Sequence, residues 1–184
     1  MTPRHPIPTL PRLWLMTDER MGDRLWPALR RLPPGSGVVF RHYATPPAAR
    51  RALYRRVARL ARGRRLLLVR AGPDRLGPED GVHGHHGAGL VTWPVHSRAQ
   101  AVRALRAGAA ALFVSPVFAT RSHPGAAALG PVTALRIARG MPVAVIALGG
   151  VDARRGAALV RRGFRGWAAI DAWAGDQKRN AVPI

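Results

Sequence analysis

Polar and basic side chains recur at the ends of apolar runs in this sequence, and these are the residues that could do chemistry. The stretch SPVFATRSH, residues 115–123, leaves such a run and places hydroxyl groups, an arginine and a histidine in one loop. Hydroxyl, guanidinium and imidazole groups all donate hydrogen bonds to phosphate oxygens. Other runs end at Arg41, Arg70, His83, His96, the pair Gly149 and Gly150, and Asp171. The set is basic and nearly free of carboxylates, so it suits an anion better than Mg²⁺, which prefers hard oxygen ligands.

Two adjacent glycines, Gly149 and Gly150, directly precede a predicted helix that Asp152 caps. Glycines at this place let main-chain N–H groups converge on a helix N-terminus, where the helix dipole also attracts an anion. The pair therefore predicts a phosphate site. Two glycines at a strand end also make an ordinary tight turn, and the sequence leaves both interpretations open.

A histidine-rich segment, HGHH at residues 83–86, raises the question of a metal centre. A zinc site takes at least three well-placed ligands, commonly including cysteine. The chain has no cysteine. Ordinary loop histidines are therefore favoured over a metal site.

The apolar runs that carry these residues have the pattern of buried parallel strands. They are continuous rather than alternating, as expected for strands covered on both faces. About eight are present, at residues 13–17, 37–42, 65–70, 81–83, 90–96, 111–115, 142–148 and 166–170. Eight predicted parallel strands indicate an α/β protein with a TIM (β/α)₈ barrel, in which the active site lies at the carboxyl ends of the strands. A doubly wound open sheet is the competing architecture.

Amphipathic segments alternate with the apolar runs and supply the predicted helices. They cover residues 22–32, 46–63, 97–108, 131–140 and 152–163, with Ser97 as a helix cap and Pro131 at a helix start. A Gly/Pro-rich stretch follows the third strand, so the helix around strands 3 and 4 must be short or missing. One domain over residues 1–184 is expected, with an irregular arm at 1–11 and an irregular tail at 175–184.

Composition excludes several classes of protein. A hydrophobic content of 47% argues against a disordered chain, and no apolar run approaches the length that spans a membrane. We expect a cytoplasmic protein. The formal net charge of +21 favours anionic partners. However, 29 of the 30 basic residues are arginines in a chain rich in Ala, Gly and Pro, so the charge indicates a general bias in amino-acid composition. The basic helix at 46–63 carries no recognised nucleic-acid motif, so nucleic acid is not the expected partner.

Much of the chain resembles the thiamine phosphate synthase and TenI (thiazole tautomerase) family of TIM barrels. The resemblance runs from LWLMTDER through GVVFRHY, LLLVR, DGVHGHHG and the region from residue 96 to 130, to VAVIALGGV and GFRGWAAIDAW. The block SPVFATRSH, followed by LG and then ALGGV, is the most specific part. The resemblance implies a single phosphorylated small-molecule ligand site at the mouth of the barrel.

The family pattern assigns roles to the loop residues. Thr120, Ser122 and His123 stand where two threonines and a lysine of the synthases bind pyrophosphate and thiazole phosphate. In the synthases, a pyrimidine diphosphate ionises, a thiazole phosphate attacks, and Mg²⁺ helps to carry the departing pyrophosphate. Arg41 matches a family arginine, but both aspartates that hold Mg²⁺ are replaced here, one at Arg70 and Ala71 and the other near Gly87 or Ala88. We therefore expect no cofactor.

The resemblance yields a set of expected site residues. The expected catalytic residues are His123, Arg41 and Arg70, and the expected substrate and phosphate ligands are Thr120, Ser122, Gly149, Gly150, His83, His96 and Asp171. His96 fits a family histidine, and Asp171 stands where the family has a serine beside the phosphate.

Three alternatives to a synthase-like transferase remain open. One is a TenI-like tautomerase, which needs no Mg²⁺ and in which His123, His83 or His96 would act as acid or base. Another is an inactive barrel that serves as a ligand sensor or partner subunit. The third is nucleic-acid binding by the basic helix. The sequence also leaves a homodimer open.

Overall fold

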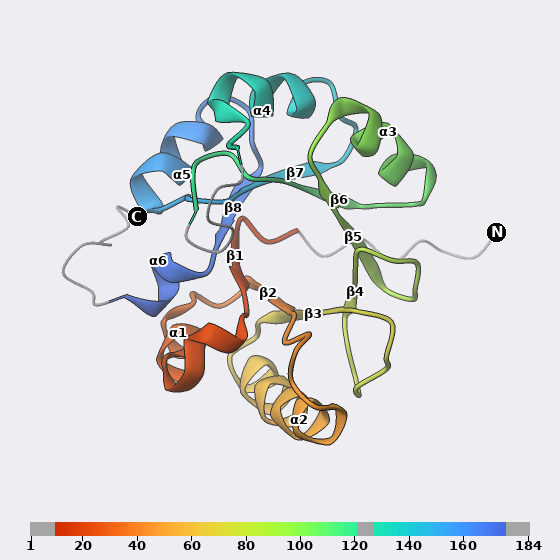
Figure 1. Ribbon diagram of the computed structural model, residues 1–184, viewed down its shortest axis with the longest axis vertical. Coiled ribbons are helices and arrows are strands. Elements are labelled where there is room, and N and C mark those ends of the chain that lie inside the picture. The colour runs from red at the N-terminus through yellow and green to blue at the C-terminus, as the bar shows by residue number, and fades with distance from the viewer. Residues whose placement is uncertain (1–9, 121–126, 176–184) are drawn as a thin grey trace.

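The computed structural model describes residues 10–120 and 127–175 and shows a closed barrel of eight strands (Figure 1). All neighbouring strands are parallel and follow chain order, with β1 closing the ring against β8. The strands are β1 (Leu13–Met16), β2 (Gly37–Phe40), β3 (Leu67–Ala71), β4 (Gly81–His83), β5 (Leu90–Val95), β6 (Ala111–Val114), β7 (Ala144–Leu148) and β8 (Gly166–Ala169). The predicted TIM barrel is confirmed, and the doubly wound sheet is excluded.

Helices cover most of the outside of the barrel. They are a 3₁₀ helix η1 (Glu19–Arg24) and the helices α1 (Leu25–Arg31), α2 (Pro47–Gly63), α3 (Arg98–Arg106), α4 (Gly130–Ala138), α5 (Ala153–Val160) and α6 (Asp171–Ala174). No helix separates β3 from β4 or β4 from β5, and Figure 1 shows only loops outside β4. The expected loss of a helix around strands 3 and 4 is therefore confirmed.

The predicted helix caps are confirmed, whereas the bounds of one helix and one strand differ from the prediction. The side chains of Ser97 and Asp152 accept hydrogen bonds from the backbone N–H groups of Gln100 and Arg155, and so cap α3 and α5. The helix predicted at 22–32 is observed as the last residues of η1 followed directly by α1, and the non-helical backbone of Gly22 places a kink inside η1. The third strand begins two residues later than predicted because Arg65 has a φ of 55°, which is incompatible with a strand.

Large apolar side chains fill the interior of the barrel below the mouth. Trp14 is fully buried and packs edge to face against Phe113, with ring centroids 5.2 Å apart. Gly37 makes room for this indole, because a Cβ at Gly37 would lie only 2.1 Å from the Trp14 ring. The barrel is thus closed and packed at this level, so a ligand can enter only from an end. In the described part of the chain, no helix is long and apolar enough to cross a membrane.

Candidate functional site

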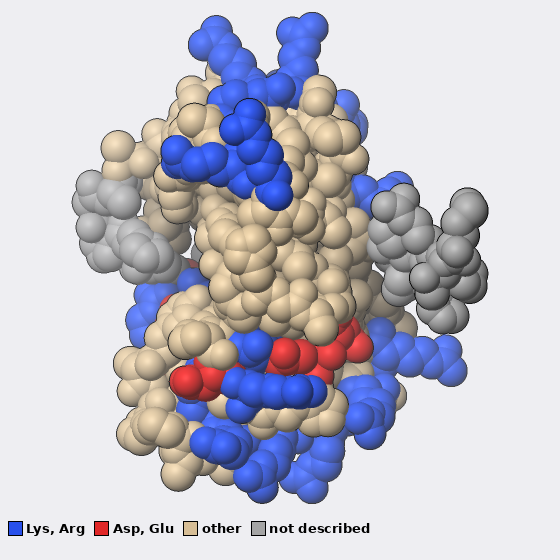
Figure 2. All heavy atoms as spheres, turned by 90° about the vertical axis from the view of Figure 1, so that its right-hand side faces the viewer, with Lys and Arg blue, Asp and Glu red and all other residues tan. Residues whose placement is uncertain are grey.

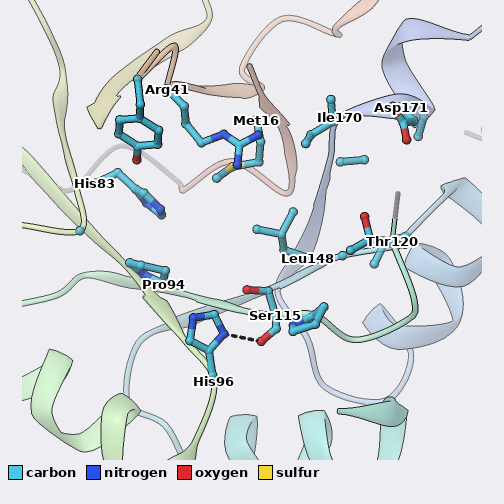
Figure 3. Close-up of a pocket in the computed structure, with 18 of the residues that line it drawn as sticks. Met16, Arg41, His83, Pro94, His96, Ser115, Thr120, Leu148, Ile170 and Asp171 are labelled. Atoms are coloured by element: carbon cyan, nitrogen blue, oxygen red, sulfur yellow. Dashed lines mark hydrogen bonds between the residues drawn. The ribbon is translucent and has the colours of Figure 1, made fainter. Parts of the chain in front are cut away.

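A cavity of about 870 Å³ opens at the end of the barrel where the strands reach their carboxyl ends, which we call the mouth. Residues from all eight strand ends line it, as expected for an active site in this fold. The lining includes Met16, Arg41, Tyr43, Gly72, His83, His85, Pro94, His96, Ser115, Thr120, Leu148, Gly149, Gly150, Ile170 and Asp171. Figure 3 shows the labelled histidines on one side of this cavity, and Thr120 and Asp171 on the opposite side.

A glycine turn forms the wall of the cavity between β7 and α5. Gly149 and Gly150 have φ angles of 92° and 61°, a region that residues with a Cβ rarely adopt. The segment after β6 lies directly against the turn, because the Phe118 N–H donates to the Gly149 carbonyl at 3.0 Å. A Cβ on Gly150 would lie 2.3 Å from the Ala119 carbonyl oxygen. The turn therefore brings bare main chain to the cavity at the N-terminus of α5.

An arginine on α5 holds this turn from outside. Nη1 of Arg155 donates to the Gly150 carbonyl oxygen at 2.7 Å, and the guanidinium lies 4.7 Å from the centre of the Phe118 ring. Because the Gly150 carbonyl is held by Arg155, the orientation of the peptide unit after it is fixed. Thr120 follows Phe118 by two residues and lines the same side of the cavity.

Asp171 places a carboxylate on this side of the mouth. It is the first residue of α6, directly after β8, and it lines the cavity. Its negative charge contributes to the raised pKa of Arg20, although the hydrogen bond from Arg20 to Asp18 is the larger cause. Asp171 and Arg20 therefore interact electrostatically at the rim.

The opposite side of the cavity is built around a buried histidine. His83 ends β4 with only 5% of its surface exposed. Its Nδ1 lies 2.9 Å from Oγ1 of Thr92, and the Thr92 hydroxyl donates to the Val82 carbonyl at 3.2 Å. Burial, with added repulsion from Arg41 and His85, lowers the pKa of His83 to about 3. His83 is therefore neutral at physiological pH.

Two further histidines line the same side. Nδ1 of His96 lies 2.6 Å from the Ser115 carbonyl oxygen, which can only accept, so Nδ1 carries a proton (Figure 3). His85 donates in the same way from Nδ1 to the His86 carbonyl at 2.8 Å, and its Nε2 lies 3.4 Å from Nη1 of Arg70. Both rings are thus oriented by main-chain carbonyl groups.

Arg41 reaches the cavity from the end of β2, but its guanidinium is already paired. Nη2 lies 3.0 Å from Oδ2 of Asp18, and Nε donates to the Thr17 carbonyl at 2.8 Å. Burial lowers the pKa of Arg41, while the charge of Asp18 opposes that shift. Arg41 lines the cavity as part of an ion pair rather than as a free cation.

Arg70 does not line the cavity, and its guanidinium belongs to a separate cluster of side chains. Its Nε lies 2.5 Å from Oε2 of Glu79, its Nη2 donates to Oε1 of Glu79 at 3.0 Å, and Nη1 also donates to the Gly72 carbonyl. Its side chain is 6% exposed, and Arg70 is not among the lining residues. It contacts the site through the lining residues His85 and Gly72. Arg70 therefore anchors the β3–β4 segment in the place where a direct ligand was expected.

The charges of the rim are paired more completely than the net charge suggests. Beside η1, Arg20 and Arg41 both pair with Asp18. In the β3–β4 segment, Arg70 pairs with Glu79, and Asp74 pairs with Arg50 at 3.7 Å. Figure 2, in which the β4 and β5 side of the barrel faces the viewer, shows a band of acidic side chains with basic side chains next to it. Arg50 also donates to the Ala71 carbonyl at 2.7 Å. These arginines stabilise the rim.

The donor set of the cavity does not fit a Mg²⁺ ion. Asp171 is the only carboxylate among the lining residues, and no group of three His, Cys, Asp or Glu side chains that could hold a metal is found in the described chain. Mg²⁺ prefers near-octahedral oxygen ligands, usually with one or two carboxylates and the substrate phosphates. Residues 121–126, which lie outside the described residues, have the sequence RSHPGA and contain no Asp or Glu.

The structure thus brings most of the predicted site residues together. Seven line one cavity: Arg41, His83, His96, Thr120, Gly149, Gly150 and Asp171. Arg70 does not, and Ser122 and His123 lie outside the described residues. Two residues that orient groups of the site, Asp18 and Thr92, were not predicted from the sequence. Asp18 could have been predicted, because it is a charged residue directly after the first apolar run. Thr92 could not, because a threonine within an apolar strand is common and does not indicate a function.

Two sequence comparisons point to the same family. A family model described as thiamine monophosphate synthase matches residues 69–173, more than half of the chain. A thiamine-phosphate synthase of Chloroflexus aurantiacus is 34% identical over 84 residues, which are 45% of this chain and 39% of that protein. The match thus spans about two-fifths of the curated relative.

Solved structures agree at the level of the fold. A thiamine phosphate pyrophosphorylase from Pyrococcus furiosus has a TM-score of 0.75 at 20% identity, covering 90% of this chain and 88% of that one. The corresponding protein of Bacteroides thetaiotaomicron has a TM-score of 0.56 at 20% identity, covering 92% and 88%. With the barrel, the mouth cavity and the matched residues together, the chain belongs to the thiamine monophosphate synthase family.

Proposed function

We propose that this protein binds a phosphorylated pyrimidine, a phosphorylated thiazole or thiamine phosphate at the mouth of the barrel, and acts as a thiamine phosphate synthase-like transferase of thiamine biosynthesis. The observation that carries the proposal is one cavity, about 870 Å³ in volume, that joins the glycine turn to a wall of histidines. Because such ligands are charged intermediates of metabolism, we also propose a cytoplasmic location.

The phosphate end of the ligand would lie at Gly149 and Gly150. Main-chain N–H groups at a helix N-terminus attract anions, and barrels commonly hold phosphate after strands 7 and 8. Thr120 lines the same side and brings a hydroxyl group. The apolar side chains of Met16, Pro94 and Leu148 would contact the faces of a ring.

The proposed binding does not depend on Mg²⁺. A divalent cation in the cavity would meet one carboxylate, and the nearby Glu79 is occupied by Arg70. We therefore expect thiamine phosphate to bind equally well with EDTA and with Mg²⁺ in isothermal titration. If neither thiamine phosphate nor a thiazole phosphate binds in either condition, the proposal is wrong. Rescue of a synthase-deficient strain would exclude an inactive barrel.

A metal-free tautomerase is a second candidate, and His96 favours it. Because Nδ1 of His96 donates to the Ser115 carbonyl, the other ring nitrogen, Nε2, is left for proton transfer. An isomerisation assay on a thiazole carboxylate phosphate tests this candidate, with His96→Gln as the variant. No turnover by the wild-type protein would remove it.

Removing the carboxylate of Asp171 should strengthen phosphate binding. A negative charge on the phosphate side of the cavity repels a dianion, and nearby water and salt weaken but do not abolish that repulsion. We expect Asp171→Asn to bind thiamine phosphate about tenfold more tightly. Asp23→Asn, an exposed substitution on η1 with the same change in net charge, is the matched control. Equal effects of the two variants would show that Asp171 does not face the bound phosphate.

A further inference from the structure

We propose that the β4 and β5 side of the cavity recognises the exocyclic amine of an aminopyrimidine through Nε2 of His83, and that Thr92 sets this preference by holding His83 in one tautomer. The inference rests on the proposed function and selects among its ligands. Ligands with an aminopyrimidine ring, such as thiamine phosphate, carry N–H donors on that ring. The thiazole ring of a thiazole phosphate carries none.

The tautomer follows from counting protons between three groups. The Thr92 hydroxyl has one proton, and it donates that proton to the Val82 carbonyl. Its oxygen must therefore accept the hydrogen bond from His83, so Nδ1 of His83 carries the ring proton. Thr92 is fully buried, so bulk water does not compete for its hydroxyl. A neutral imidazole with a proton on Nδ1 has a lone pair on Nε2.

The position of this lone pair makes it a recognition group. No hydrogen bond to Nε2 of His83 is found in the part of the chain that the structure describes, while the residue lines the cavity and its ring points inward (Figure 3). The ring also packs edge to face on Phe113, with centroids 5.2 Å apart and an interplanar angle of 87°. Its orientation is therefore fixed before a ligand arrives.

The neighbouring histidines strengthen the same preference. His96 uses its Nδ1 proton on Ser115, and His85 uses its Nδ1 proton on His86 and its Nε2 on Arg70. In its neutral form, each ring therefore offers the cavity no donor. A ligand group that contacts these three rings must donate, because burying an acceptor without a partner weakens binding roughly tenfold to a hundredfold. An unsubstituted ring or a carboxylate cannot donate a hydrogen bond to these rings, whereas an aromatic amine can.

A pair of matched ligands tests the preference directly. Oxythiamine phosphate differs from thiamine phosphate in carrying an oxo group in place of the amine, so the atom that should face His83 becomes an acceptor. We expect it to bind at least tenfold more weakly in isothermal titration. If neither of these ligands nor a thiazole phosphate binds, the proposed function itself has failed, whereas binding of the thiazole phosphate alone would refute only this inference. If both bind equally well, the proposed function stands and this inference is wrong.

Substitution of Thr92 tests its positioning role. Thr92→Val keeps the shape of the side chain and removes the hydroxyl, so the ring proton is free to move to Nε2. We expect the preference for the amine to fall to threefold or less, and Thr92→Ser, which keeps the hydroxyl, to retain it. A merely structural role would weaken both ligands equally and leave their ratio unchanged, which would contradict the proposal.

The tautomer can also be measured without any ligand. Protonated and unprotonated imidazole nitrogens differ in their ¹⁵N chemical shifts, so ¹⁵N-histidine labelling reports which nitrogen of His83 carries the proton. We expect a protonated Nδ1 in the wild-type protein and in Thr92→Ser, and a mixture in Thr92→Val. A protonated Nε2 in the wild-type protein would overturn the inference whatever the ligand data show.

Discussion

Gly150→Ala should abolish most phosphate binding and markedly destabilise the fold. Gly150 has a φ of 61°, and a Cβ there would lie 2.3 Å from the Ala119 carbonyl oxygen and 2.8 Å from Cβ of Phe118. A left-handed backbone together with an overpacked contact costs about 3 kcal/mol. For a domain of this size that lowers Tm by roughly 10 °C. Relief of the contact moves the segment before Thr120, so we expect at least tenfold weaker binding of thiamine phosphate.

A second glycine provides the matched control. Gly140, between α4 and β7, has a similar φ of 69°, but a Cβ added there would have no other atom within 4 Å. Gly140→Ala should therefore show only the backbone cost of about 1–2 kcal/mol and normal ligand binding. Calorimetry and titration of both variants decide the question. If the two variants lose stability and affinity to the same extent, the close approach of Gly150 to Ala119 has no role.

If Gly150→Ala does not fold, Arg155→Met tests the same turn without backbone strain. It removes the hydrogen bond from Arg155 to the Gly150 carbonyl and retains a long apolar stem against Phe118. Loss of one such bond corresponds to roughly twofold to tenfold weaker binding. Unchanged affinity would show that the orientation of this peptide unit is not needed for the ligand.

The protein should lose stability between pH 7 and pH 5, and His83 should cause much of the loss. Its pKa is about 3 in the folded protein because the ring is buried, against about 6.5 in an unfolded chain. Below pH 6.5 the unfolded chain therefore binds the proton that the folded protein excludes, and the free energy of unfolding falls with pH. At pH 5 this one group contributes a loss of about 2 kcal/mol.

Denaturant unfolding of His83→Gln at both pH values measures this contribution. The variant should lose about 2 kcal/mol less than the wild-type protein between pH 7 and pH 5. A smaller dependence remains, since burial also lowers the pKa of His42. His86→Gln, at an exposed position, is the control and should retain the wild-type dependence. A wild-type slope in His83→Gln would contradict the assignment of a buried neutral ring.

The fold could be predicted closely because its signals are local. Runs such as ALFV at β6 are apolar throughout, and a strand buried on both faces requires only that composition. Ser97 and Asp152 cap helices through backbone groups three residues away, so their role is visible in a short window. The exact start of β3 was missed, since the turn at Arg65 depends on a backbone conformation that its residue type does not announce.

The sequence by itself determined the barrel and the gathering of seven predicted residues at its mouth, because parallel strands must bring their carboxyl ends to one side. Only the tertiary structure decided which of those groups remain available to a ligand. Asp18 neutralises Arg41 from 23 residues away, and Glu79 withdraws Arg70 from the cavity. Thr92 orients His83 across two strands. Such pairings depend on distances of a few ångströms between side chains, and neither composition nor spacing along the chain specifies them.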